Sequence, residues 1–140
     1  MKRRIHVNSC IFCEIISKRE KAYIVYENEH VCCFLDKFPI NKGHVLVVPK
    51  KHYVEFSELD AITLQEVALA SQKIGIALEK LLDADGVTFM QNNGIFKDVD
   101  HYHMHIVSRF KDDGFSWVEP NFEMTERDFE SLYLYVKNVL

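Results

Sequence analysis

Three histidines alternate along one short stretch of the chain, at His101, His103 and His105. Side chains at alternate positions of a β-strand point to one face, so a strand here would bring three imidazoles together. Imidazole ionises close to neutral pH and can serve as a nucleophile, a proton carrier or a metal ligand. This stretch is therefore the first candidate for the chemistry of the protein.

Two simpler explanations compete with a catalytic role for these histidines. A single histidine on a strand is usually a hydrogen-bonded structural residue, and alternating histidines can simply chelate a metal ion. Cupin-like metal sites pair His-x-His with a glutamate a few residues later, but residues 106–110 read Ile-Val-Ser-Arg-Phe and contain no carboxylate. That form of metal site loses support, whereas a metal-dependent hydrolase that uses all three histidines as ligands stays open.

The length and charge of the chain limit its class. The 140 residues suit one domain, which needs no disulfide to build a core. The net charge of −4 comes from acidic residues spread along the sequence, which argues against a nucleic-acid-binding or anionic-membrane surface. The basic residues 2–4 make a poor signal peptide, and no apolar segment is long enough to span a bilayer. We expect a cytoplasmic protein without membrane or nucleic-acid partners.

The four cysteines fall into two pairs with different surroundings. Cys32 and Cys33 are adjacent in an apolar stretch, and a strand there would point them to opposite faces as small buried hydrophobic residues. Cys10 and Cys13 form a Cys-x-x-Cys motif, whose sulfurs can share a tetrahedral metal or form a redox pair. The motif alone does not choose between these two chemistries.

Hydrophobic patterning predicts the elements that must position these residues. Strand-forming residues occupy 22–27, 30–35 and 44–48, with a hairpin turn at 28–29, and a short helical turn is expected at 14–20. An apolar stripe at helical spacing predicts a helix from about residue 59 to 82, with Ser57 or Thr63 as the N-cap. The stripe consists of Leu64, Val67, Ala68, Ile74, Leu78, Leu81 and Leu82.

The second half of the chain completes the predicted fold. Residues 86–91 and 99–110 are predicted strands that pair as a hairpin around a turn at 92–98, so the three histidines lie on the second strand. A final helix is predicted from Thr125, where Thr-x-x-Asp resembles a capping box. The result is one α+β domain with an antiparallel sheet of about five strands, a long crossover helix and a C-terminal helix.

Several blocks of the sequence, taken in order, resemble the histidine triad (HIT) family, whose signature is His-x-His-x-His followed by apolar residues. Besides the triad, these blocks are residues 10–16, 25–27, 34–36, 43–52 and 91–94. The resemblance runs from Cys10 to about Trp117 and points to the bacterial branch related to the HINT nucleotide-binding proteins. It implies a HIT-like fold for a single domain over residues 1–140, with a core at 10–117 and a C-terminal extension at 118–140.

The resemblance also implies an activity. In the family the middle histidine attacks the α-phosphorus of a nucleotide conjugate, so His103 would carry a transient nucleotidyl group, which water then removes. His105 would donate a hydrogen bond to phosphate oxygens or assist the leaving group, and His101 completes the triad. The expected enzyme is a homodimer that hydrolyses a nucleoside phosphoramidate or a dinucleoside polyphosphate. The alternative is a nucleotide-binding regulatory or adaptor protein with little turnover.

Family landmarks also indicate where the nucleotide would bind. The expected contacts are Asp36, Phe34, Phe12, Ile15, Asn93 and Trp117. Asp36 would accept hydrogen bonds from ribose hydroxyls. The three apolar residues at positions 12, 15 and 34 would hold the base, although ordinary core packing explains them equally well. Asn93 is also a natural turn residue, and packing is an equal explanation for Trp117.

In some members of the wider family, zinc is held by the Cys-x-x-Cys pair, a histidine after the Pro-Lys-Lys block and the first histidine of the triad. The matching residues here are Cys10, Cys13, His52 and His101. Two thiolates and two imidazoles complete a tetrahedral set, which favours a structural zinc ion over redox chemistry. The remaining histidines, which are expected to be non-catalytic, are His6, His30 and His44.

One loop departs from the family pattern. Between Asn93 and the triad the family has a longer loop, with Gly-Gln and a small residue that contact phosphate, but residues 95–100 here are fewer, bulkier and charged. Asp98 and Asp100 would place negative charge beside an anionic substrate unless they point away or support a histidine. The loop therefore leaves the preferred substrate open.

Overall fold

A computed structural model of the chain describes residues 10–140, so His6 and the basic residues 2–4 lie outside the described part. Five strands in this part form one antiparallel sheet in the order β1-β2-β3-β5-β4. The strands are β1 (Ile24–Glu27), β2 (Val31–Leu35), β3 (His44–Pro49), β4 (Gly86–Met90) and β5 (Met104–Arg109). The helices are α1 (Ile11–Ile16), α2 (Ala61–Leu82) and α3 (Glu126–Val139). The predicted α+β fold is confirmed.

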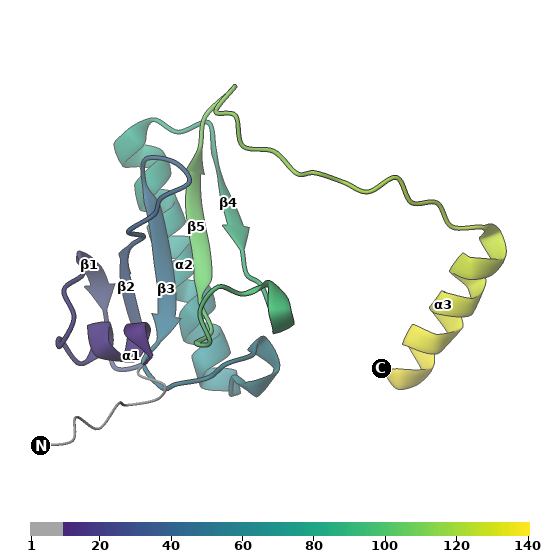
Figure 1. Cartoon of the computed structure of the whole chain (residues 1–140), viewed down its shortest axis with the longest axis horizontal. Helices are drawn as coiled ribbons and strands as arrows, with labels where there is room; N and C mark the ends of the chain where they lie inside the picture. The colour runs from purple at the N-terminus through teal and green to yellow at the C-terminus, as the bar shows by residue number, and fades with distance from the viewer. Residues whose placement is uncertain (1–9) are drawn as a thin grey trace, which may run out of the picture.

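The two faces of the sheet carry different layers, with α2 behind the sheet and α1 in front of it in Figure 1. Cys33 points to the α2 face and packs in one hydrophobic core with Val67 of that helix. Cys32 points to the other face and belongs to a second core with Phe12 of α1. The prediction that the adjacent cysteines face opposite sides is therefore confirmed.

The long helix α2 begins at a cap that the sequence analysis did not choose. The N-cap is Asp60, whose Oδ1 accepts the backbone N–H of Thr63 at 2.7 Å, so the prediction of Ser57 or Thr63 was wrong. Asp60 also accepts a hydrogen bond from the Tyr53 hydroxyl at 3.1 Å, a tertiary contact that local propensity does not reveal. Of the predicted stripe, residues such as Val67 are buried, whereas Leu81 near the C-terminus is exposed.

Strand β5 is shorter than predicted. It spans Met104–Arg109, so only His105 of the triad lies within it, and the predicted start of the strand at residue 99 was wrong. Just before the strand, the backbone N–H of Tyr102 donates to the carbonyl of Tyr53 at 2.7 Å and not to a neighbouring strand. Side chains nevertheless alternate across this stretch, because Tyr102 packs in the α2 core while His101 contacts Phe12 on the opposite face.

Two further boundaries differ from the predictions. Strands β4 and β5 pair as expected, with Met90 opposite His105, but residues 91–103 join them and include a 3₁₀ turn at Gly94–Phe96. Helix α1 covers Ile11–Ile16 and not residues 14–20, because its N-cap is Cys10, whose sulfur accepts the N–H of Cys13 at 3.4 Å. The helix thus begins at the first residue of the Cys-x-x-Cys motif.

The C-terminal helix lies away from the sheet, at the end of a long irregular segment (Figure 1). Its predicted capping box is present, since Thr125 accepts the N–H of Asp128 and the Asp128 carboxylate accepts the N–H of Thr125. The apolar side chains of α3, such as Phe129 and Leu132, are exposed. Within residues 10–140, no helix combines the length and the apolar character needed to cross a membrane.

Candidate active site and metal cluster

The three histidines lie on the sheet face opposite α2. They are nearly inaccessible to solvent, with 0% of His101, 5% of His103 and 9% of His105 exposed. The residues between them, Tyr102 and Met104, point the other way, since Tyr102 is part of the α2 core and Met104 packs against it. The strand alternation proposed from the sequence therefore places the imidazoles on one face, although β5 itself covers only the last of them.

His103 is held by one ring nitrogen and presents the other. Its Nδ1 lies 2.7 Å from the carbonyl oxygen of His101. A carbonyl only accepts hydrogen bonds, so Nδ1 carries a hydrogen and donates it, which fixes the orientation of the ring. Nε2 lies 3.1 Å from Oδ1 of Asp98. The edge-on contact with Phe12, at 5.1 Å between ring centroids, completes the packing around the ring.

A cavity of about 810 Å³ opens beside His103, between α1 and the front of the sheet. It brings together the predicted nucleotide contacts on the N-terminal half of the chain, which are Phe12, Ile15, Phe34 and Asp36. Asp36 follows β2, and its Oδ1 accepts the backbone N–H of Phe38 at 2.8 Å. A mostly apolar cavity with a few fixed polar groups is typical of a small-molecule site.

Two predicted contacts lie elsewhere. Asn93 does not line the cavity, and its Oδ1 accepts the backbone N–H of Phe56 at 2.8 Å, where it holds the loop before β5 against the 3₁₀ turn Phe56–Glu58. Trp117 lies on the segment after β5, is 67% exposed, and its ring is tilted against that of Phe115. Within a single chain, neither residue is part of the cavity.

His44, which the sequence analysis set aside as non-catalytic, is a buried partner of His105. The backbone N–H of Ile40 donates to Nδ1 of His44 at 3.0 Å, so the hydrogen of the neutral ring is on Nε2. That Nε2 lies 2.9 Å from Nδ1 of His105 and donates to it. The hydrogen of neutral His105 is consequently on its Nε2. A chain of two hydrogen bonds thus determines which nitrogen of His105 can donate to a ligand.

Burial keeps both of these rings neutral. Desolvation is the main cause that lowers the pKa of His44, and together with the nearby His103 and His44 it lowers the pKa of His105 to about 4. His105 therefore presents an N–H beside His103, whose ring centroid is 4.8 Å away. The sequence places His44 at the start of a predicted strand. It does not show that this strand, β3, lies next to β5, and the pairing of the two histidines depends on that adjacency.

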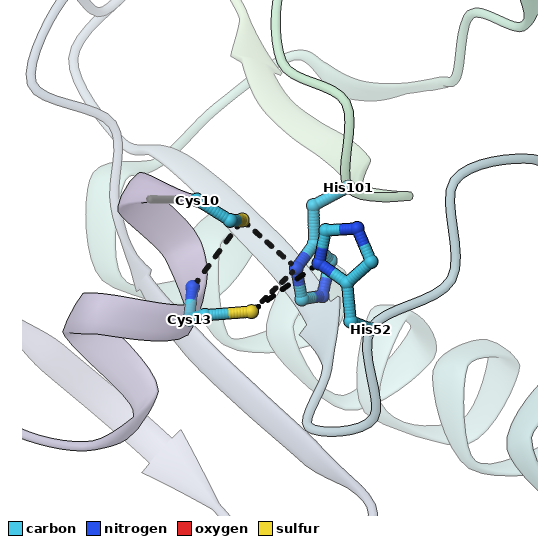
Figure 2. Close-up of side chains that lie close together, drawn as sticks. All are labelled: Cys10, Cys13, His52 and His101. Carbon is cyan, nitrogen blue, oxygen red and sulfur yellow. Dashed lines mark hydrogen bonds between the residues drawn. The ribbon is translucent and has the colours of Figure 1, made fainter. Parts of the chain in front are cut away.

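The predicted zinc ligands converge at the other end of the same face, as Figure 2 shows. Sγ of Cys10 lies 3.3 Å from Nδ1 of His101, and Sγ of Cys13 lies 3.3 Å from Nδ1 of His52 and 3.5 Å from Nδ1 of His101. Zinc bonds of about 2.3 Å to sulfur and 2.0 Å to nitrogen place tetrahedral ligands about 3.5 Å apart. The cluster therefore has the spacing of a closed tetrahedral zinc site.

The surroundings of His101 also fit a metal ligand. Its Nε2 donates to the carbonyl of Pro49 at 2.8 Å, which leaves the lone pair of Nδ1 facing the sulfurs. Burial lowers the pKa of His101 to about 4, so the ring is neutral. Burial and the neighbouring Cys10 raise the pKa of Cys13 to about 11, and a bound cation would reverse this by stabilising the thiolate. Donor types, spacing and tautomer all suit zinc.

Comparisons with known proteins agree with this fold and site. The HIT domain model matches residues 17–112. A HIT family protein of Bacillus subtilis has a solved structure with 33% identity and a TM-score of 0.87, over 95% of this chain and 98% of that one. A zinc-bound histidine triad family protein of Mycobacterium smegmatis shares 32% identity, with a TM-score of 0.74 over 94% of this chain and 98% of that one.

A third solved structure carries a more specific name. It is a hypothetical histidine triad nucleotide-binding protein of Sulfolobus tokodaii, with 32% identity and a TM-score of 0.70 over 92% of this chain and 90% of that one. The chain belongs to the HIT family.

Proposed function

We propose that this protein hydrolyses a nucleoside phosphoramidate or a dinucleoside polyphosphate at the α-phosphate, through a nucleotidyl intermediate on His103. The observation that carries the proposal is the geometry of that ring. Nδ1 is held by the carbonyl of His101, while Nε2 lies at the 810 Å³ cavity that also contains Asp36. The similarity to a protein named as nucleotide-binding supports a nucleotide as the occupant.

The proposed reaction divides one displacement into two. Nε2 of His103 forms a bond to the α-phosphorus while the bond from phosphorus to the leaving group breaks. The departing nitrogen or oxygen takes its proton from solvent, and Nε2–H of His105 donates a hydrogen bond that stabilises the charged phosphate oxygens. Water then attacks the phosphorus and loses its proton to solvent while the bond from phosphorus to Nε2 of His103 breaks, which releases a nucleoside monophosphate.

We also propose that Cys10, Cys13, His52 and His101 hold one structural zinc ion. Such an ion would supply cross-linking and no catalysis, because four protein ligands leave no open position. It would join α1 to the segment after β3 and to the residue two positions before His103. The ligand role of His101 would therefore also fix the carbonyl that orients the nucleophile.

We further propose a homodimer of one-domain chains, each with a core at residues 10–117 and an extension at 118–140. The outer surface of α2 and β4 supports this, since a groove of about 460 Å³ includes Gly75 and Phe89. Nearby Ile62, Leu69 and Ile76 are exposed on the same helix. Large apolar patches on a surface usually mark an interface. A dimer would also give Trp117 and α3 a second chain to contact.

The proposed activity is tested with adenosine phosphoramidate and diadenosine tetraphosphate as substrates, and with AMP as a binding probe. The substitution His103→Ala should abolish turnover and the trapped adenylyl adduct but leave AMP binding detectable, while His30→Ala should change neither. Unchanged turnover in His103→Ala would refute the nucleophile. Wild-type protein that binds AMP but forms no adduct and no product would favour the adaptor function. Activity that persists after exhaustive chelation would exclude a hydrolase that depends on metal at the triad.

A further inference from the structure

Asp98 occupies an unexpected place in the site. Its Oδ1 lies 3.1 Å from Nε2 of His103, and the residue lines the 810 Å³ cavity. The side chain of Asp98 is 77% exposed, and His103 is its only hydrogen-bonding partner in the described part of the chain. The carboxylate is thus tethered at one end only, to the atom that must attack phosphorus.

This contact differs from the carboxylate–histidine pairs that orient a catalytic ring. Such a carboxylate binds the nitrogen that does not react, but in His103 that nitrogen, Nδ1, is already held by the carbonyl of His101. A reacting phosphorus must approach to about 3.0–3.5 Å of the nucleophile. The oxygen of Asp98 is already within this distance. The carboxylate therefore stands where the α-phosphate has to bind.

Apart from His103 itself, whose hydrogen bond to Oδ1 requires a hydrogen on Nε2, no cation in the described chain offsets the charge of this carboxylate. The adjacent Lys97 is directed away, since its Nζ lies 2.7 Å from Oε1 of Glu55 and 2.9 Å from the carbonyl of Gly94. Lys21 and Lys37 line the cavity, but neither forms an ion pair with Asp98. An α-phosphate that enters beside Nε2 therefore meets a carboxylate at close range, with no lysine or arginine of the described chain paired to it.

A metal ion held by Asp98, His103 and His105 is a competing explanation, because one ligand atom from each lies within 4.8 Å of the others. The hydrogen bonds of His44 oppose it. They place the hydrogen of neutral His105 on Nε2 and engage Nδ1, so this ring has no lone pair to offer. With these hydrogen bonds in place, His105 cannot serve as the third ligand of this cluster.

We propose that Asp98 determines substrate specificity by occupying the α-phosphate position until the substrate displaces it. This inference rests on the proposed function and narrows its substrate class. A polyphosphate brings a divalent cation, typically Mg²⁺. Proteins usually bind this ion through one or two carboxylates together with the phosphate oxygens of the substrate. That cation would draw Asp98 away from Nε2 and neutralise its charge. The site therefore favours the Mg²⁺ complex of a dinucleoside polyphosphate over a phosphoramidate, which brings no such cation.

Binding measurements test the displacement without any need for turnover. By calorimetry, Asp98→Asn and Asp98→Ala should bind AMP at least about fivefold more tightly than wild type, because one repulsive charge pair is removed. Adenosine, which lacks the phosphate, should bind all forms equally, and Asp100→Asn should behave as wild type. Equal AMP affinity in wild type and both Asp98 variants would overturn the proposal.

The cation is tested separately with ATP as the probe. Addition of Mg²⁺ should strengthen ATP binding more in the wild type than in Asp98→Asn, and an equal gain in both would overturn the role of the cation. If turnover is present, the ratio of kcat/KM for diadenosine tetraphosphate to that for adenosine phosphoramidate should fall at least about fivefold in Asp98→Asn. An unchanged ratio would contradict the specificity claim. A protein without turnover would refute the proposed hydrolase, whereas the AMP comparison would still decide the position of Asp98.

Discussion

His44 donates a hydrogen bond of 2.9 Å to His105 from a neighbouring strand, and the backbone N–H of Ile40 determines its direction. This hydrogen bond can run only from His44 to His105. The other neutral tautomer of His44 would place its Nδ1–H against the backbone N–H of Ile40. The identity of the donor atom on His105 is therefore decided outside the triad. We regard His44 as a positioning residue for the proposed reaction.

Removing that donor should weaken catalysis more than binding. In His44→Ala we expect kcat to fall about tenfold to a hundredfold with little change in KM, because His105 loses the bond that fixes its tautomer. His44→Gln keeps an amide donor and should retain more activity than the alanine variant. Steady-state kinetics provide the measurement, with His30→Ala as the surface control. A wild-type kcat in His44→Ala would show that the hydrogen bond has only a structural role.

The zinc proposal makes a compositional prediction. Cys13→Ser should lose about one zinc ion per chain, measured by elemental analysis, whereas Cys32→Ala should keep it because Cys32 lies in the apolar core. Chelation should lower the Tm of the wild type by several degrees, since metal binding contributes to folding, and should leave the Tm of Cys13→Ser unchanged. Equal zinc content in wild type and Cys13→Ser would remove the basis for the site.

Gly43, the residue before His44, tests how tightly β3 packs at its start. Its φ of 82° is in the left-handed region, and an added Cβ would collide with the Leu82 side chain and lie 2.7 Å from Oγ of Ser108. Gly43→Ala should therefore reduce the free energy of unfolding by about 2–4 kcal/mol. Gly114 has a similar φ of 77° with open space around it, so Gly114→Ala should cost only about 1–2 kcal/mol. Chemical denaturation compares the two, and equal losses would exclude the steric contribution at Gly43.

Asp113 should make stability depend on pH in the acid range. The Arg109 guanidinium, 2.7 Å away, and the backbone N–H of Phe115 hold the pKa of Asp113 well below its usual range. A lowered folded-state pKa adds stability above the unfolded value of about 3.9, and this stability is lost as the pH falls below that value. The difference in unfolding free energy between wild type and Asp113→Asn should therefore be largest near neutral pH and shrink below about pH 4.

Denaturation at pH 7, 5, 4 and 3 would measure this trend. Asp112→Asn is the matched control, because Asp112 neighbours Asp113 without any hydrogen bond or ion pair seen in the described residues. A difference between wild type and Asp113→Asn that stays constant down to pH 3 would contradict the assignment.

Much of the fold was predictable because its patterns are local. Alternation in β2 and β3, the helical stripe of α2 and the capping box at Thr125 each depend on residues a few positions apart. The convergence of Cys10, Cys13, His52 and His101 was also predictable, but only through family resemblance, since the four residues come from three separate segments. Periodicity alone would have left Cys10 and Cys13 undecided.

The missed cap was readable locally, because Asp60 accepts the backbone N–H of Thr63 three residues later and aspartate is a preferred N-cap residue. The other features that were missed depend on contacts between distant segments. His44 needed the adjacency of β3 and β5. The sequence indicates that Asp98 brings negative charge close to the triad. Only the structure shows that its carboxylate is directed at Nε2 of His103.

The alternation around β5 has a consequence for how this gene can change over time. Odd positions from 101 to 105 hold the imidazoles, while the even positions Tyr102 and Ile106 build the core under α2. Inserting or deleting one residue there would exchange the two sets, so it would disrupt the proposed site and the core in a single event. A length change in residues 91–100 is less disruptive, because these residues form no strand and precede the alternating stretch. The segment that carries Asp98 can therefore change in length without turning the imidazoles to the other face.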